Sequence, residues 1–180
     1  MKYIIFDLEA TCWEDDKKKQ SEIIEIGAVK INDKLQIEDE FQIFVKPKLN
    51  PVLSDFCKKL TTIKQSDVDR ARDFGGAVYD FIKWIDEKND DYYLCSWGFY
   101  DKKQLKSDCE LHQIGTKWIK NHMSIKHQHG KIINVDKGVG MSEALKLLDI
   151  KLEGTHHRGI DDAKNIAKIF IKIFDKLTFE

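Results

Sequence analysis

Residues 3–9 have the sequence YIIFDLE, an almost unbroken apolar run that ends in two carboxylates. The run is too short for a typical helix, and its composition is typical of a strand buried on both faces of a sheet. We therefore expect a central strand here. Because side chains along a strand alternate between its two faces, Asp7 and Glu9 should leave this strand on the same face.

The segments outside this strand predict the rest of an α/β fold. Segments rich in residues that favour β-structure predict three further strands, at 23–31, 41–45 and 92–97. We expect the strands 23–31 and 41–45 to form an antiparallel hairpin beside the strand at 3–9. Apolar residues at three- and four-residue spacing, or mixed leucines and charges, favour helices over residues 74–85, 101–113, 141–148 and 160–177, with short helices between 55 and 72. Strands come first, and strands and helices then alternate.

Length and composition are those of one ordinary globular domain, which we expect to span residues 1–180. Hydrophobic residues make up 42% and charged residues 34% of the chain, which excludes disordered, collagen-like and membrane-spanning classes. The N-terminus reaches Asp7 too soon for a signal peptide, so we expect a cytoplasmic protein. The net charge of -1 provides no general attraction for a nucleic-acid backbone, so any such binding must be local or metal-assisted.

The cysteines do not indicate a metal site or a disulfide framework. All four lie far apart in the sequence without a C-x-x-C pair, and we expect them to be mostly buried free thiols: Cys12, Cys57, Cys95 and Cys109.

Three groups of polar residues follow or precede the predicted elements. Asp7 and Glu9 on one face would repel each other, so they favour a divalent cation as a partner, unless the strand end lies in solvent. Asp101 follows the predicted strand 92–97 and could reach the same sheet edge, or could cap a helix. His157 converges with Asp162 only if it lies on the loop before the last helix, because five helical steps would separate them by about 140°.

Together these residues resemble the three motifs of the DEDDh (DnaQ-like) 3′-to-5′ exonucleases: Phe6 to Thr11, Asp101, and His157 to Asp162. Residues 54–69 further resemble the subgroup that contains the histone-mRNA and small-RNA exoribonucleases and the KapD-type bacterial proteins. The resemblance covers nearly the whole chain. It implies a ribonuclease H-like mixed sheet, with three N-terminal antiparallel strands plus parallel strands, flanked by helices.

The resemblance also implies the site. Its metal ligands, which would hold two Mg²⁺ or Mn²⁺ ions, are Asp7, Glu9, Asp101 and Asp162. His157 would be the general base that takes the proton from the attacking water. In this interpretation His157, and not the preceding His156, has the correct spacing to Asp162. The substrate-binding residues would be Thr11, Phe56 and Tyr100, with the two aromatic rings stacking on the 3′ base, although Phe56 could instead be a core residue.

The implied activity is removal of nucleotides from the 3′ end of a single-stranded nucleic acid, with RNA favoured. Two alternatives remain: a DNA-directed, proofreading-like exonuclease, and a binding module of the same fold without turnover. We expect His122, His127 and His129 to be solvated loop residues and not zinc ligands, because no Cys/His pair has the required spacing. A lysine-rich stretch forms either a basic rim beside Asp101 or an ordinary helix exterior; its members are Lys102, Lys103, Lys106, Lys117, Lys120, Lys126 and Lys131.

Overall fold

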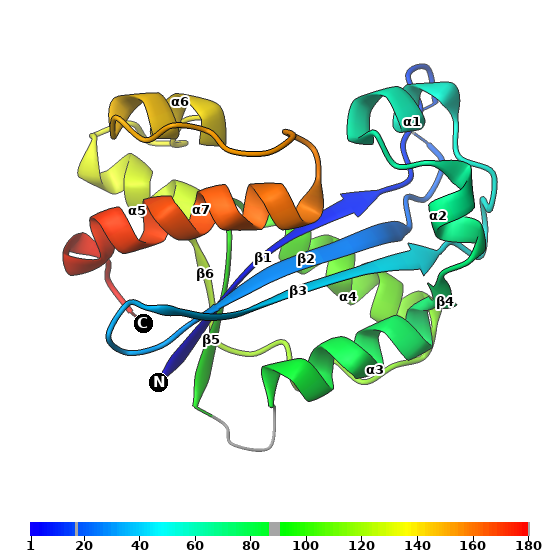
Figure 1. The fold of residues 1–180 in the computed structure, drawn as a ribbon, viewed down its shortest axis with the longest axis horizontal. Helices are drawn as coiled ribbons and strands as arrows, with labels where there is room; N and C mark the ends of the chain where they lie inside the picture. The colour runs from blue at the N-terminus through cyan, green and yellow to red at the C-terminus, as the bar shows by residue number, and fades with distance from the viewer. Residues whose placement is uncertain (17, 87–90, 180) are drawn as a thin grey trace.

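A computed structural model describes residues 1–16, 18–86 and 91–179. Its centre is a six-stranded sheet with the strand order β4-β3-β2-β1-β5-β6 (Figure 1). The strands are β1 (Lys2–Ala10), β2 (Ile23–Ile31), β3 (Ile37–Lys46), β4 (Arg72–Asp73), β5 (Tyr92–Ser96) and β6 (His122–Ser124). Strand β1 is therefore central, as its apolar run predicts.

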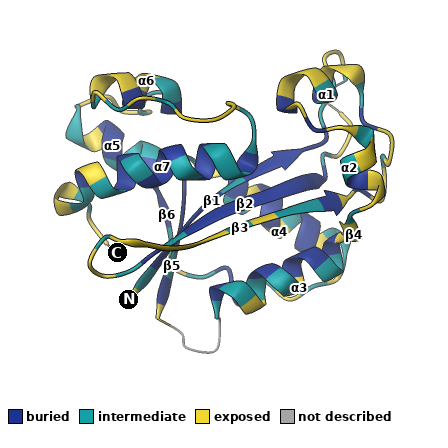
Figure 2. Cartoon of the chain, viewed as in Figure 1, coloured by how far each residue is buried: buried dark blue, intermediate teal, exposed yellow. Residues whose placement is uncertain are grey.

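The pairing of the strands confirms the predicted mixed sheet. β1 pairs antiparallel with β2, and β2 antiparallel with β3, whereas β5 runs parallel to β1 and β6 parallel to β5. Ile4, Ile5 and Phe6 on β1 are completely buried, so this strand is covered on both faces. In Figure 2 the central strands are correspondingly dark, while β3 is exposed over much of its length. The parallel pairing brings the C-terminal ends of β1 and β5 to the same edge.

Helices cover both faces of the sheet, which gives three layers (Figure 1). They are α1 (Asp55–Thr61), α2 (Gln65–Asp69), α3 (Phe74–Ile85), α4 (Tyr100–Leu111), α5 (Ile125–Ile132), α6 (Met141–Leu147) and α7 (Gly159–Ile173), followed by a 3-10 turn, η2 (Phe174–Lys176). On one face Ile4 and Phe6 pack with the apolar stripe of α3, including Phe81. On the other face Ile5 packs with the stripe of α7, including Phe170.

The histidine-rich segment differs from the expectation. His122 begins strand β6, His127 and His129 lie on α5, and His129 is completely buried, so the prediction of solvated loop histidines is wrong. The reason is that β6 has only three residues, too few to show a period, and that charged and polar residues fill much of α5. Helix α4 begins at Tyr100, which places Asp101 in its first turn and not at the cap.

The cysteines agree with the expectation. Cys57, Cys95 and Cys109 are buried, Cys12 is partly buried, and all are free thiols. No helix in the described part of the chain is both long and apolar enough to cross a bilayer.

Candidate active site

An open cavity of about 410 Å³ lies at the sheet edge where β1 and β5 end. The structure brings six of the predicted site residues to its lining: Asp7, Glu9, Tyr100, Asp101, His157 and Asp162. They come from β1, from the first turn of α4, and from the loop and first turn that begin α7. Segments that are far apart in the sequence therefore meet at one place, because β1 and β5 are parallel neighbours and α7 packs across β1 and β2.

Three of the carboxylates are close enough to share a cation. One oxygen each from Asp7, Glu9 and Asp162 lies within 4.8 Å of the others. Glu9 and Asp162 are both buried. Asp101 stands slightly apart, and its Oδ1 accepts a hydrogen bond from the backbone N–H of Leu8 on β1, at 3.4 Å. Hard divalent cations prefer such oxygen ligands, so this donor set fits Mg²⁺ or Mn²⁺.

Several carboxylates lie close together in a buried place, which raises the pKa values of three of them. Burial and the neighbouring carboxylates, first Asp101 and then Glu9, raise the pKa of Asp7 well above its usual range. Burial and the charge of Asp162 raise the pKa of Glu9 to about 8. Burial also raises the pKa of Asp101 to about 6, although hydrogen bonds from its own backbone, from Leu8 and from Ser96 oppose this rise. A bound cation would offset both causes of these shifts, the burial of the carboxylates and, secondly, their mutual repulsion.

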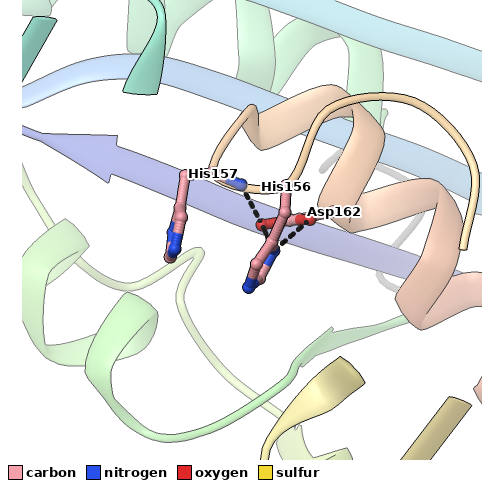
Figure 3. A group of neighbouring side chains, drawn as sticks. All are labelled: His156, His157 and Asp162. Atoms are coloured by element: carbon pink, nitrogen blue, oxygen red, sulfur yellow. Dashed lines mark hydrogen bonds and ion pairs between the residues drawn. The ribbon is translucent and has the colours of Figure 1, made fainter. Parts of the chain in front are cut away.

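The histidine loop contacts Asp162 in two ways (Figure 3). Nδ1 of His156 lies 3.0 Å from both carboxylate oxygens of Asp162, and the backbone N–H of His157 donates to Oδ2 at 3.0 Å. The two imidazole rings stack with their centroids 4.0 Å apart. The ring that touches Asp162 thus belongs to His156, while the His157 ring lines the cavity without a hydrogen-bond partner among the residues that the structure describes.

His157 has a strained backbone, which its neighbours impose. Its φ of 65° lies in the left-handed region that non-glycine residues rarely adopt. The hydrogen bond from its N–H to Asp162 holds this conformation. Burial, followed by the charge of His156, lowers the pKa of His157, with Asp162 acting in the opposite direction. The His157 imidazole is therefore neutral at neutral pH and can accept a proton.

Two residues that hold this loop in place, Glu25 and Gly27, are not among those predicted from the sequence. Glu25 is completely buried on β2, opposite Glu9, and its carboxylate accepts the Gly159 N–H at 3.0 Å and the Arg158 Nε–H at 3.2 Å. Gly27 allows the start of α7 to rest directly on β2, because a Cβ at this position would overlap the Gly159 backbone. A charged residue in the middle of the apolar run 23–31 was the available signal for Glu25.

The predicted substrate-binding residues fall into two groups. Tyr100 lines the cavity and is 57% exposed, so its ring is available to a ligand. Phe56 is half-exposed on α1, outside the cavity lining, and the neighbouring Cys57 packs its Sγ 3.7 Å from the Ala10 carbonyl oxygen. Thr11 is buried, and its Oγ1 accepts the Glu22 N–H at 2.9 Å. The substrate roles of Phe56 and Thr11 remain predictions.

Of the lysines proposed as a basic rim, Lys126 lines the cavity. Its backbone N–H donates to the carbonyl of Trp97, at 2.7 Å, and its side-chain stem lies against Gly138, which has a φ of 63°. Lys126 is thus anchored at the end of β5, next to the carboxylates.

Comparison with known proteins places this geometry in a family. Residues 4–170 match the Exonuclease family (RNase_T). The chain is 36% identical over 182 residues to 3′-5′ exoribonuclease 1 of Homo sapiens, covering 94% of this chain and 51% of that protein. It is 33% identical over 192 residues to ERI1 exoribonuclease 2 of Homo sapiens, covering 94% of this chain and 28% of that protein. The chain spans about half, or less, of the length of these curated relatives.

Solved structures give the same result. The nuclease domain of 3′hExo, described as a DEDDh family member bound to rAMP, superposes with a TM-score of 0.93 at 34% identity, covering 99% of this chain and 96% of that one. A 3′-exonuclease solved for the 3′-end specific recognition of a histone mRNA stem-loop gives a TM-score of 0.90 at 33% identity, covering 97% and 81%. The resemblance expected from the three motifs is confirmed, and the chain belongs to the exonuclease family, in its DEDDh group.

Proposed function

We propose that this chain is a metal-dependent exonuclease that removes nucleotides one at a time from the 3′ end of single-stranded RNA. The observation that carries the proposal is the convergence of Asp7, Glu9 and Asp162 within 4.8 Å of one another, in a cavity that His157 also lines. The names of the relatives, an exoribonuclease and a 3′-5′ exoribonuclease, support the choice of RNA.

Membership of the DEDDh group implies dependence on divalent metal ions. In our proposal, two Mg²⁺ or Mn²⁺ ions are held by Asp7, Glu9 and Asp162, with Asp101 contributing from its slightly separate position. When bound, such ions stabilise the charge that develops on the attacking and leaving oxygens of a phosphodiester displacement. The raised pKa values of Asp7 and Glu9, caused first by burial and then by neighbouring carboxylates, support this occupancy.

The residues around the carboxylates have different roles in the proposed reaction. His157 accepts the proton of the attacking water at a ring nitrogen, for which its lowered pKa keeps it neutral. His156 orients the Asp162 carboxylate through Nδ1. Tyr100, beside Asp101, supplies an exposed ring on which the terminal base stacks, a contact that tolerates any base. Glu25 fixes the start of α7 and thereby the position of the histidine loop.

The test compares labelled single-stranded RNA, single-stranded DNA and duplex RNA, each with a free or a blocked 3′ end, in Mg²⁺ and in Mn²⁺. We expect stepwise shortening of RNA with a free 3′ end, and no product from blocked ends. Asp7→Ala and Asp162→Ala should abolish turnover while the melting curve remains cooperative. Full activity in excess EDTA would refute the metal-dependent mechanism, and faster cleavage of DNA than of RNA would favour the DNA-directed alternative.

A further inference from the structure

A second cavity, of about 170 Å³, lies beside the carboxylate cavity. The two share a wall at the start of α4, where Gly98 and Tyr100 line the carboxylate cavity and Phe99 between them lines the second one. They share another wall at the start of α5, where Lys126 lines the carboxylate cavity and His127 lines the second one. Because consecutive Cα atoms are only about 3.8 Å apart, a strand whose 3′ end lies at the carboxylates can reach the second cavity with an upstream nucleotide.

Phe99 provides an aromatic surface in the second cavity. Its ring contacts the imidazole of His127, with centroids 4.7 Å apart, and that of His122, with centroids 5.9 Å apart. These contacts hold the ring in place, while 45% of the residue stays exposed. Tyr100, the next residue, is exposed in the carboxylate cavity. Two neighbouring exposed rings, each in its own cavity, are suited to stack on successive bases of a single strand.

The hydroxyl of Ser124 determines which nitrogen of His127 carries the proton. Ser124 is buried, and its Oγ–H donates to the carbonyl oxygen of Trp97 at 3.2 Å, while Oγ also lies 2.7 Å from Nδ1 of His127. A hydroxyl has only one proton, so both contacts are hydrogen bonds when Nδ1 of His127 carries an N–H and donates to Oγ. In the neutral ring Nε2 is then an acceptor, and within the described part of the chain it has no hydrogen-bond partner. His127 therefore offers one acceptor nitrogen to a ligand in the second cavity.

The size and the remaining polar groups of the second cavity limit what it can hold. Its volume corresponds to about six water molecules of about 30 Å³ each, which suits one planar ring system and is smaller than the roughly 300 Å³ of a site for a larger ligand. The amide of Gln128 is already used at both ends by the backbone of Thr178, at 2.9 and 3.2 Å. Lys131 also lines the cavity, is exposed, and has no carboxylate partner among the described residues. A ring therefore fits inside, with a phosphate outside near Lys131.

We propose that the second cavity binds the base of an upstream nucleotide of the substrate strand, which stacks on Phe99 and donates from an exocyclic amino group to Nε2 of His127. This inference rests on the proposed function, because the occupant belongs to the strand whose 3′ end lies at the carboxylates. Adenine, cytosine and guanine carry an exocyclic amino group, whereas uracil has none. The second cavity thus gives RNA binding a base preference that stacking on Tyr100 alone does not provide.

The test measures the affinity of the full chain for short 5′-labelled single-stranded RNAs, with Ca²⁺ in place of Mg²⁺ to suppress cleavage. Each RNA contains only uridine, except for a single cytidine that is moved stepwise away from the 3′ end. We expect cytidine at one upstream position to strengthen binding about two- to tenfold, as for one hydrogen bond, and cytidine at the 3′ end to have no effect. Equal affinity of the wild-type chain for all of these RNAs would overturn the proposal.

Two variants separate the acceptor from the stacking surface. His127→Phe keeps a ring against Phe99 but removes Nε2, so it should abolish the cytidine preference and leave the affinity for the all-uridine RNA within a few-fold of wild type. Phe99→Ala should weaken binding of all the RNAs by roughly tenfold or more. A cytidine preference that persists in His127→Phe would refute the role of the acceptor.

A mononucleotide and a matched variant show whether Phe99 acts directly. Cytidine monophosphate reaches only the carboxylate cavity, so Phe99→Ala should not change its affinity. An equal loss for the mononucleotide and for the RNA would show that Phe99 acts only through Tyr100 and Asp101, and would overturn the proposal. Tyr79→Ala removes an aromatic side chain that is 65% exposed on α3 and lines neither cavity, so it should leave RNA affinity unchanged. A loss in Tyr79→Ala as large as that in Phe99→Ala would refute a specific role for Phe99.

Melting curves and cleavage assays keep the outcomes distinct. If Phe99→Ala does not fold, the cytidine preference of the wild-type chain and its loss in His127→Phe decide the question. If the wild-type chain neither binds nor shortens RNA, the proposed function fails, and this inference fails with it. If the wild-type chain shortens RNA from the 3′ end but binds it without any upstream base preference, only this inference fails.

Discussion

Replacing Gly27 by alanine should move the site residues at the start of α7 away from those on β1. Gly27 on β2 faces the first residues of α7, and a Cβ built there overlaps the backbone carbon of Gly159 and the nitrogen of Ile160. The distances from this Cβ to both backbone atoms are shorter, by more than about 1 Å, than the roughly 3.5 Å at which non-bonded carbon atoms are normally in contact. Backbone atoms cannot rotate away as a flexible side chain can, so the start of α7 must move by more than about 1 Å.

This displacement predicts both a loss of activity and a loss of stability. Asp162 and the histidine loop move with α7, whereas Asp7 and Glu9 remain on β1. A misplacement of about 1 Å can lower a catalytic rate about 100-fold, and overpacking of this kind costs about 1 to 3 kcal/mol. For a chain of this length, that loss lowers the melting temperature by about 2 to 12 °C.

A graded series of glycine variants makes the prediction specific. A Cβ at Gly115 meets nothing within 4 Å, and a Cβ at Gly159 lies 3.2 Å from the Asp7 carbonyl oxygen and the Gly27 nitrogen. Single-turnover rates on 3′-labelled RNA, at saturating Mg²⁺, should therefore decrease in the order Gly115→Ala, Gly159→Ala, Gly27→Ala, with the first near wild type. A folded Gly27→Ala variant that cleaves within threefold of wild type would refute the reasoning.

The other predictions concern titration, the general base and the stacking rings. In EDTA, the free energy of unfolding should fall as the pH rises from about 7 to 9, because Glu9, with a pKa of about 8, retains in the folded chain a proton that the unfolded chain loses near 4.5. Below this range the histidines with lowered pKa values, such as His122, act in the opposite direction. Added Mg²⁺ should remove most of this decline, and a melting temperature that is flat or rises with pH in EDTA would contradict it. His157→Ala should lower the single-turnover rate by about 10² to 10⁴. His156→Ala removes the Nδ1 contact to Asp162 and should cost less, about tenfold. The opposite ranking would show that the motif is aligned one residue out of register. Tyr100→Ala and Phe56→Ala should each weaken binding of single-stranded RNA by roughly ten- to a hundred-fold. The affinity is measured with Ca²⁺ in place of Mg²⁺, to suppress cleavage. Unchanged RNA affinity in both variants would exclude the stacking role.

The local sequence pattern is sufficient for the central strand and the large helices. An apolar run of strand length predicts β1, because a strand that is covered on both faces has no solvent side on which to place polar residues. The stripes of α3 and α7 are likewise visible in the sequence, because a helix that packs on one face repeats its apolar residues about every 3.6 positions. The D-x-E pattern of Asp7 and Glu9 follows from the two-residue period of the same strand.

Elements whose sequence shows no periodic pattern of apolar residues could not be predicted, because their formation depends on the tertiary structure. The three-residue strand β6 and the polar helix α5 are formed where β5 and the helices around it provide partners. His129 is therefore buried and His122 is partly buried, although many residues of this segment are polar. Only the fold places Phe56 outside the cavity lining and Tyr100 within it.

The contacts that support the site residues also cannot be predicted from the local sequence pattern. Glu25 accepts the N–H of Gly159, which lies 134 residues further along the chain. A buried polar side chain requires a partner, and its residue type says only that this requirement exists. The identity of that partner depends on which elements pack together. The types of the catalytic residues can therefore be predicted from the sequence, whereas the groups that hold them in position are specified by the packing of α7 on β2.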